Sequence, residues 1–232
     1  MKAALIRELF VRETVHYCEL GLMRPEEVPV DADKYTELME FLRDNPQHFS
    51  LRSRRLVIGS EEYYEKTAAK FVHGRHSNPR PSPPSTIPDP AVRIVLSSHY
   101  GIDSKRLDAV EREHQHAMAS ENFVGKLLER YLADRLEPHG WIWCAGDFVK
   151  AIDFLRPKGS NWQPIQVKNR DNSENSSSAA IRDGTDIEKW FRTYSRTGET
   201  NWHNFPGDTE AYGLSEDDFH RYIVGYFTPK PA

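Results

Sequence analysis

The sequence has few cysteines and no long run of apolar residues. Cys18 and Cys144 are the two cysteines among 232 residues, and they stand too far apart for a local metal-ligand motif. This usage favours a reduced, cytoplasmic protein over a disulfide-bonded secreted one. The lack of any stretch of eighteen apolar residues excludes a membrane-spanning helix. Charged residues interrupt the apolar stretch within 1–20, so we expect an amphipathic helix there rather than a signal peptide.

The sequence also lacks an excess of basic residues. Its formal net charge is −4, whereas many nucleic-acid-binding proteins are basic because phosphate contacts dominate their affinity. A nucleic-acid partner remains compatible with this charge, since a metal-dependent site concentrates carboxylates. Residues 48–80 carry a local basic excess of seven Lys/Arg against three acids. A hydrophobic content of 38% and a charged content of 28% indicate a globular protein with a real core.

Composition divides the chain into three regions. Residues 1–78 have apolar residues at helical spacing and predict a mainly helical N-terminal region. Residues 79–90 contain six prolines in twelve residues, which favours an extended linker, with a ligand for a partner domain as the alternative. Residues 91–232 are expected to form the main α/β domain.

That domain is predicted to contain a long helix followed by strands. Residues 93–102 fit either a short strand or a helix. The clearest helix is 120–140, with Ser120 as its N-cap and Pro138 near its end. Strand candidates rich in aromatic and β-branched residues follow at 141–145, 149–155 and 162–168. A turn at 156–161 joins the last two strands, which are expected to be antiparallel.

The C-terminal part has a different character. Residues 171–186 are rich in Asn and Ser and predict a long loop. Residues 187–195 resume helical spacing, and residues 215–227 predict a final helix with Ser215 as its N-cap.

The predicted hairpin combines an acid with a lysine. Side chains alternate between the two faces of a strand, so Asp153 points away from its apolar neighbours, and Gln166 and Lys168 share one face. Pairing of the strands can therefore bring these three side chains onto one surface. Such a surface suits phosphodiester hydrolysis, in which oxygen ligands hold Mg²⁺ and a lysine activates the attacking water. The alternative is an ordinary hairpin with charged ends.

This pattern, Asp153 followed after twelve residues by Gln166-Val167-Lys168, resembles the PD-(D/E)XK nuclease superfamily. The resemblance implies a core in which a mixed sheet is flanked by helices. In this chain Gln166 replaces the second metal-binding carboxylate. An amide oxygen still binds Mg²⁺ but brings no charge, so we expect another acid to compensate.

The preceding helix offers that acid. The superfamily often carries a glutamate there, and Gly125 and Glu129 match its frequent spacing. Glu121 is the second choice. Eight residues separate the two glutamates, which places them roughly 80° apart around a helix, so only one of them is expected to serve.

A wider stretch, residues 118–206, resembles the type II restriction endonuclease family typified by SinI. The resemblance is most specific in the run after Lys168 and around Trp190 and Trp202. It implies cleavage of double-stranded DNA at GGWCC, where W is A or T, with Mg²⁺. Cutting both strands of a pseudo-palindrome requires two active sites, so we expect a homodimer.

Polar residues in and around the long loop are the candidate DNA contacts, because Arg pairs with guanine, Asn with adenine, and Asp with cytosine. These candidates are Asn169, Arg170, Asn172, Asn175, Arg182, Asp183, Arg192 and Asn201. The alternative for each is a solvated loop residue. Four aromatic residues fit stacking on an extruded base, although core packing is favoured: Trp190, Phe191, Trp202 and Phe205.

Two rival functions fit the same residues. Gln166 favours a non-catalytic DNA-binding protein that retains a decayed nuclease fold. A repair or junction nuclease shares the chemistry but not the target. Specific binding without cleavage supports the first rival, and cutting of branched or sequence-random DNA supports the second.

Overall fold

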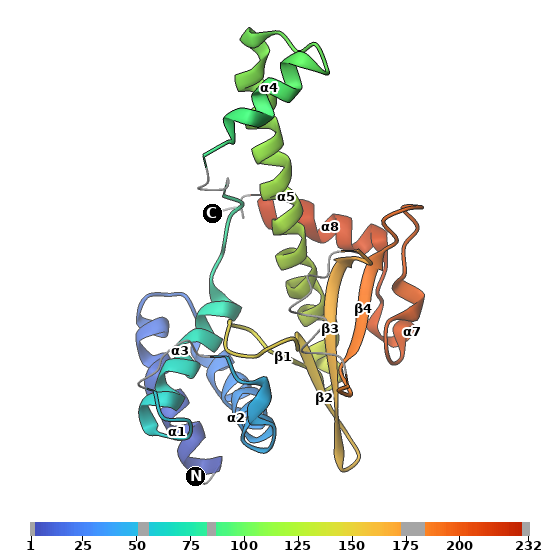
Figure 1. Cartoon of the computed structure of the whole chain (residues 1–232). Coiled ribbons are helices and arrows are strands. Elements are labelled where there is room, and N and C mark those ends of the chain that lie inside the picture. Colours follow the sequence, from blue (N-terminus) through green and yellow to red (C-terminus); the bar gives the residue numbers. More distant parts are fainter. Residues whose placement is uncertain (1–2, 51–55, 83–86, 173–183, 229–232) are drawn as a thin grey trace. The chain divides into compact units, whose positions relative to one another are not determined.

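The computed structural model describes residues 3–50, 56–82, 87–172 and 184–228 (Figure 1). The chain forms two compact units, one made of Met1–Ser77 together with Leu128–Ala232, and the other of Asn78–Leu127. This grouping differs from the one that composition suggests, in which 91–232 forms a single domain.

Three helices form the N-terminal part of the first unit, as the helical spacing of 1–78 predicts. They are α1 (Ala3–Glu19), α2 (Val28–Asp44) and α3 (Glu61–His76), with short 3-10 helices at Pro25–Glu27 and Pro46–His48. The rings of Phe10, Tyr35 and Phe71, one from each helix, pack with centroids 4.9 to 6.0 Å apart. Ser60 caps α3 by accepting a hydrogen bond from the backbone N–H of Tyr63.

Backbone hydrogen bonds join this helical part to the C-terminal part of the same unit. The N–H of Ser50 donates to the carbonyl of Phe148 over 2.8 Å, and the N–H of Lys150 donates to the carbonyl of His48 over 2.7 Å. These bonds satisfy backbone groups that neither part satisfies alone. The N-terminal helices therefore belong to the same unit as the strands.

The second unit contains α4 (Pro90–Ser98), so the ambiguous stretch 93–102 is largely helical. Helix α5 (Ser104–Leu136) begins in this unit and ends in the first. The expected N-cap at Ser120 is wrong, because its hydroxyl donates to the carbonyl of His116 within a continuous helix. The preceding turns contain no Gly or Pro that would stop the helix. Its end is as expected, with a 3-10 helix at Glu137–His139 and Gly140 at φ 80°.

A four-stranded mixed sheet follows α5 in the first unit. Its strands are β1 (Ile142–Trp143), β2 (Phe154–Lys158), β3 (Asn161–Arg170) and β4 (Glu188–Thr193), in the order β1-β2-β3-β4. The predicted hairpin is confirmed, because β2 pairs with β3 antiparallel and Phe154 lies opposite Ile165. Its turn is tighter than expected and uses Gly159 at φ 62°.

The helix expected at 187–195 is wrong, because these residues contain strand β4, which pairs parallel with β3. Pairing satisfies the free edge of β3, and it buries Trp190 against Trp202 and Phe205, with ring centroids 5.3 and 5.0 Å away. Tertiary packing thus overrides the helical spacing.

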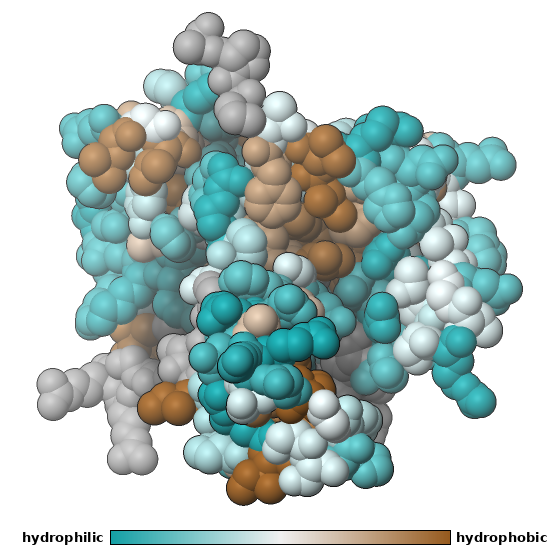
Figure 2. Space-filling model, turned by 90° about the horizontal axis from the view of Figure 1, so that it is seen from above, coloured by the Kyte–Doolittle hydropathy of each residue, from teal (hydrophilic) through white to brown (hydrophobic). Residues whose placement is uncertain are grey.

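The C-terminal residues pack onto the end of α5. They form a 3-10 helix at Trp202–Asn204, α7 (Thr209–Tyr212) and α8 (Glu216–Phe227), and Ser215 caps α8 as expected. Phe219 of α8 lies 5.3 Å from Tyr131 of α5 between ring centroids. Among the described residues, no helix is long and apolar enough to cross a bilayer. The face drawn in Figure 2 is largely hydrophilic, with hydrophobic residues gathered in separate places.

Candidate active site

Asp153 lies immediately before β2, and the neighbouring strands hold its backbone on both sides. Its N–H donates to the carbonyl of Ile165 over 2.8 Å, and its carbonyl accepts from the N–H of Cys144 over 2.9 Å. The side chain is held too, since Oδ2 accepts a hydrogen bond of 2.7 Å from the backbone N–H of Val167. The carboxylate is therefore fixed against the middle of β3.

Gln166 lies on β3, next to the residues of that strand that bind Asp153. Asp153 binds Ile165 through its backbone N–H and Val167 through its carboxylate, and these are the residues on either side of Gln166. Gln166 is 2% exposed, and its side-chain Oε1 has no hydrogen-bond partner in the described part of the chain. A buried acceptor without a donor costs free energy unless another group binds it. Lys168 follows two positions later on β3, so strand alternation puts it on the same face as Gln166.

Glu129 approaches from α5. Burial and the negative charge of Asp153 raise its pKa well above the ordinary value of 4.5, while the hydrogen bond from Trp143 and the charge of Lys168 oppose this shift. The indole N–H of Trp143 donates to Glu129 Oε2 over 3.3 Å. The structure thus brings Glu129 within electrostatic reach of Asp153 and Lys168. Glu121 is exposed and belongs to the second unit, Asn78–Leu127.

Two partly buried carboxylates close to each other make this site electrostatically unfavourable by itself. Burial also raises the pKa of Asp153, against the hydrogen bond from Val167 and the charge of Lys168. A divalent cation would offset the repulsion between the carboxylates and bind the free oxygen of Gln166. Within the described ranges, no group of three or more His, Cys, Asp or Glu side chains is placed to hold a metal ion, and this site offers two carboxylates with one amide oxygen. The oxygen donors at this site fit a hard cation such as Mg²⁺.

Two residues of the site escaped the sequence analysis. Trp143 and Cys144 both come from the strand candidate 141–145, directly after the helix that carries Glu129. Burial and the charges of Asp153 and Glu129 raise the pKa of the Cys144 thiol. The order helix–strand–acid in the sequence was a signal that this segment adjoins the acids, but the contact of Trp143 with Glu129 depends on tertiary packing.

The structure places the candidate DNA contacts in different settings. Arg170 and Asn172 are exposed just after Lys168. Arg192 forms an ion pair with Glu216 and donates from Nε to Asn169 Oδ1 over 2.9 Å. Three further candidates lie outside the described residues: Asn175, Arg182 and Asp183.

Asn201 and the aromatic candidates are mostly buried. The side-chain amide of Asn201 donates to the carbonyl of Phe191 over 3.0 Å, and Asn201 is 4% exposed. Trp190, Trp202 and Phe205 pack in the core, as favoured from the sequence. Phe191 is partly exposed.

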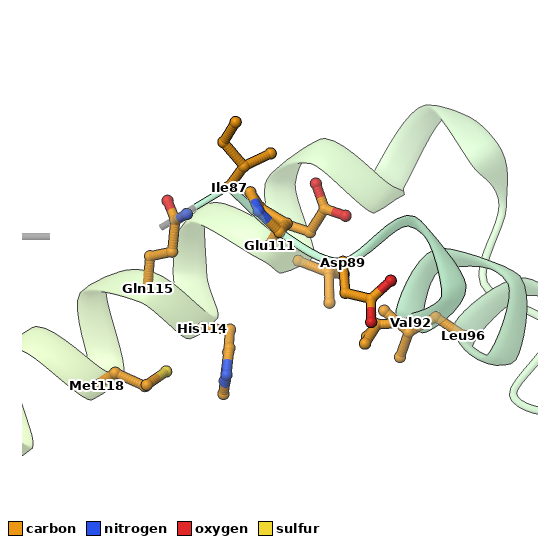
Figure 3. Close-up of a pocket in the computed structure, with 10 residues that line it drawn as sticks. Ile87, Asp89, Val92, Leu96, Glu111, His114, Gln115 and Met118 are labelled. Atoms are coloured by element: carbon orange, nitrogen blue, oxygen red, sulfur yellow. The ribbon is translucent and has the colours of Figure 1, made fainter. Parts of the chain in front are cut away.

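A separate pocket of about 450 Å³ occupies the second unit, between α4 and α5 (Figure 3). Its lining is mostly apolar and includes three ionisable side chains, Asp89, Glu111 and His114. Figure 3 shows these side chains spread along α5 and the start of α4. The lining contains none of the candidate catalytic residues, so the hairpin surface remains the candidate active site.

Carboxylates from α5 and from the start of β2, with an amide oxygen and a lysine on β3, are a donor set suited to metal-assisted hydrolysis of phosphate esters. The SinI restriction endonuclease family model matches residues 24–229, so the chain belongs to this family. The match extends the resemblance seen at 118–206 to α2 and α3. Two similar proteins are the type II restriction enzyme Eco47I of Escherichia coli, 46% identical, and the type II restriction enzyme SinI of Salmonella infantis, 45% identical. Each alignment spans 203 residues, 85% of this chain and 88% of the relative.

Proposed function

We propose that this protein is a Mg²⁺-dependent type II restriction endonuclease with a PD-(D/E)XK core, and that it cleaves double-stranded DNA at GGWCC. Membership of the SinI family and the names of its relatives support the reaction class. The observation that carries the proposed mechanism is the Asp153 carboxylate bound to the N–H of Val167 on β3, beside Gln166, whose buried Oε1 has no hydrogen-bond partner among the described residues.

Each site residue has a distinct role in this proposal. Asp153 and Glu129 hold the cation, and Gln166 adds a neutral oxygen ligand. Bound there, Mg²⁺ supplies Lewis-acid chemistry, since it lowers the pKa of water and neutralises charge on the phosphate. Lys168 orients the attacking water, accepts its proton when uncharged, and otherwise neutralises charge that develops in the transition state.

DNA recognition is assigned to residues around the loop that follows β3. The exposed Arg170 and Asn172 stand nearest to Lys168 in sequence, and Arg170 is proposed to read guanine. Asn175, Arg182 and Asp183 belong to the same proposal by their place in the sequence. Further contacts are assigned to four residues, of which the first three already make intramolecular hydrogen bonds: Asn169, Arg192, Asn201 and, by stacking, Phe191.

The proposed enzyme acts as a cytoplasmic homodimer. A pseudo-palindromic site presents the same phosphodiester to each of two subunits related by a twofold axis, so a dimer cuts both strands in one encounter. Light scattering coupled to gel filtration of the purified chain distinguishes a dimer from a monomer of 26.9 kDa. A monomer that stays monomeric on cognate DNA contradicts this part of the proposal.

Cleavage of a defined duplex tests the proposed function. We expect cutting of a duplex that contains GGWCC in the presence of Mg²⁺, and none with EDTA or with one G·C pair replaced. Asp153→Ala is expected to abolish cutting while the protein stays folded and still binds DNA. Specific binding without metal-stimulated cleavage supports the decayed-nuclease alternative, which the amide at Gln166 favours. Cutting of branched or random DNA supports a repair or junction nuclease.

A further inference from the structure

Glu129 is held by an aromatic residue from β1. The indole N–H of Trp143 donates to Glu129 Oε2 over 3.3 Å. Trp143 is 7% exposed, and its backbone N–H donates to Oε1 of Glu137 over 3.2 Å. The ring is therefore buried and its strand is tied to the residue that follows α5, so the direction of its N–H is fixed.

Two arginines lie against the Trp143 ring. The guanidinium carbon of Arg130 is 5.3 Å from the ring centre, and that of Arg75 is 5.9 Å from it. Both distances lie within the range of cation–π attraction. Arg130 is also the neighbour of Glu129 on α5, so the same helix turn carries the carboxylate and one of the groups that hold its donor.

Arg130 binds the C-terminal end of α3. Its guanidinium donates to the carbonyls of Gly74 and Arg75, each over 2.8 Å, and to the hydroxyl of Ser77 over 3.3 Å. The last carbonyls of a helix have no partner within the helix and carry partial negative charge. The guanidinium satisfies them, and this contact fixes α3 relative to the helix turn that carries Glu129.

Arg75 is fixed by a buried ion-pair cluster. Its side chain is 9% exposed, and its guanidinium donates to both carboxylate oxygens of Glu137 over 2.7 and 2.5 Å. Its Nε lies 3.1 Å from Oδ1 of Asp31 on α2. Such a bidentate pair constrains both the distance and the angle of the guanidinium.

Helix α3 also contacts the segment after β1 directly. A Cβ atom added at Gly74 would lie 2.6 Å from the backbone nitrogen of Gly146, so only glycine fits there. The end of α3 is thus packed against Ala145 and Gly146, which follow Trp143 closely in the chain.

We propose that Trp143 is a positioning residue, which directs the Glu129 carboxylate toward the cation, and that the end of α3 holds Trp143 in place through Arg75 and Arg130. This inference rests on the proposed function, because it takes Glu129 as a cation ligand. It assigns the N-terminal helices a part in the reaction. Partners that orient a metal ligand commonly change metal affinity or activity by 10- to 100-fold when they are removed.

Trp143→Phe tests the inference, because it retains an aromatic ring beside the arginines and removes the N–H. Mn²⁺ binding to the full chain without DNA is measured by the loss of the free-ion electron paramagnetic resonance signal. We expect a Kd about 10-fold higher in the variant, and a similar rise in the Mg²⁺ concentration for half-maximal cleavage. The cleavage rate at saturating Mg²⁺ is expected to approach that of the wild type. Trp162→Phe, the same change on β3, is the matched control and should change neither quantity.

An unchanged Kd for Mn²⁺ in Trp143→Phe overturns the inference, and so does a loss of cleavage that saturating Mg²⁺ does not restore. If circular dichroism shows that Trp143→Phe does not fold, Arg130→Met is the test instead. It keeps the Trp143 indole N–H and removes the guanidinium that packs against the Trp143 ring. That variant is expected to raise the Kd in the same direction, and an unchanged Kd is the contrary result. A wild-type protein that neither binds Mn²⁺ nor cleaves DNA overturns the proposed function together with this inference.

Discussion

The Asp153 carboxylate accepts a hydrogen bond of 2.7 Å from the backbone N–H of Val167. A side chain thus binds a donor of β3 that lies between Gln166 and Lys168. This bond places the carboxylate beside Gln166 and Lys168 along β3. It uses Oδ2 and leaves Oδ1 for a further ligand. Lys168 lies on β3 next to Val167, the residue that binds Asp153. The distance between the Asp153 carboxylate and the backbone of Lys168 is therefore fixed by the strand.

Asp153→Asn separates the catalytic role of this residue from its structural role. The amide oxygen can still accept the hydrogen bond from Val167, but the charge is lost. We expect cleavage to fall on the order of 1,000-fold. In EDTA, the free energy of unfolding should stay equal or rise by about 1 kcal/mol, because burial and the proximity to Glu129 disfavour the charged form. Initial cleavage rates and urea denaturation measure the two effects. A variant that cuts at the wild-type rate shows that Asp153 is misassigned.

Gln166→Glu tests whether the free amide oxygen faces a cation. A third carboxylate, at a position that is 2% exposed, should lower the free energy of unfolding of the metal-free protein by about 1 to 3 kcal/mol. Mg²⁺ should then raise the melting temperature more in the variant than in the wild type, because the added charge strengthens binding to the folded state. Scanning calorimetry with EDTA or Mg²⁺ measures this difference.

Gln163→Glu is the matched control on the same strand. Gln163 accepts a hydrogen bond of 2.9 Å from Arg156, so a carboxylate there gains an ion pair rather than a metal ligand. Its response to Mg²⁺ should equal that of the wild type. Equal responses in all three proteins would show that Gln166 is an ordinary core residue.

Local pattern was sufficient to predict the hairpin and the strand that carries Gln166 and Lys168, because strand alternation is a short-range property. It placed Asp153 within a strand, whereas Asp153 lies just before β2. It failed at β4, where pairing with β3 and burial of Trp190 outweigh a helical spacing. The local pattern also wrongly predicted an N-cap at Ser120, which lies in the interior of the longer helix α5. Contacts between segments far apart in sequence, such as that of Trp143 with Glu129, leave no local pattern to read.

Arg192→Ala and Arg170→Ala distinguish structural from DNA-reading arginines. Arg192 pairs with Glu216, and its guanidinium lies 5.2 Å from the centre of the Phe219 ring, so its loss should lower the free energy of unfolding by about 2 kcal/mol. Arg170 is exposed, so its loss should cost less stability than that of Arg192, and it should weaken cognate DNA binding by about 1 to 3 kcal/mol. Urea denaturation and fluorescence anisotropy with labelled duplex measure both. Arg192→Ala with full stability and lost sequence preference would assign base reading to Arg192.

Low pH should weaken the ion-pair cluster that holds Arg75. Burial by itself raises the pKa of Glu137, but the hydrogen bonds and charge of Arg75, with the charge of Lys34, outweigh it and hold the pKa below the ordinary value of 4.5. In the same way, His76 and Arg75 lower the pKa of Asp31 against its burial. For an acid whose pKa is lower in the folded state, the added stability is present above the unfolded pKa. It is lost as the pH falls through the folded pKa.

We therefore expect the melting temperature to decline below about pH 4.5, partly because these two carboxylates become protonated. Glu137→Gln should lower the free energy of unfolding at pH 7 by about 3 kcal/mol, since it leaves a buried guanidinium with one partner fewer. The decline between pH 5 and pH 3 should be shallower in this variant, because one of the titrating groups is gone. Glu26→Gln, which alters an exposed pair with Arg24, is the control and should shift stability by less than about 0.5 kcal/mol. Thermal unfolding followed by circular dichroism across this pH range measures each slope, and a slope for Glu137→Gln equal to that of the wild type contradicts the assignment.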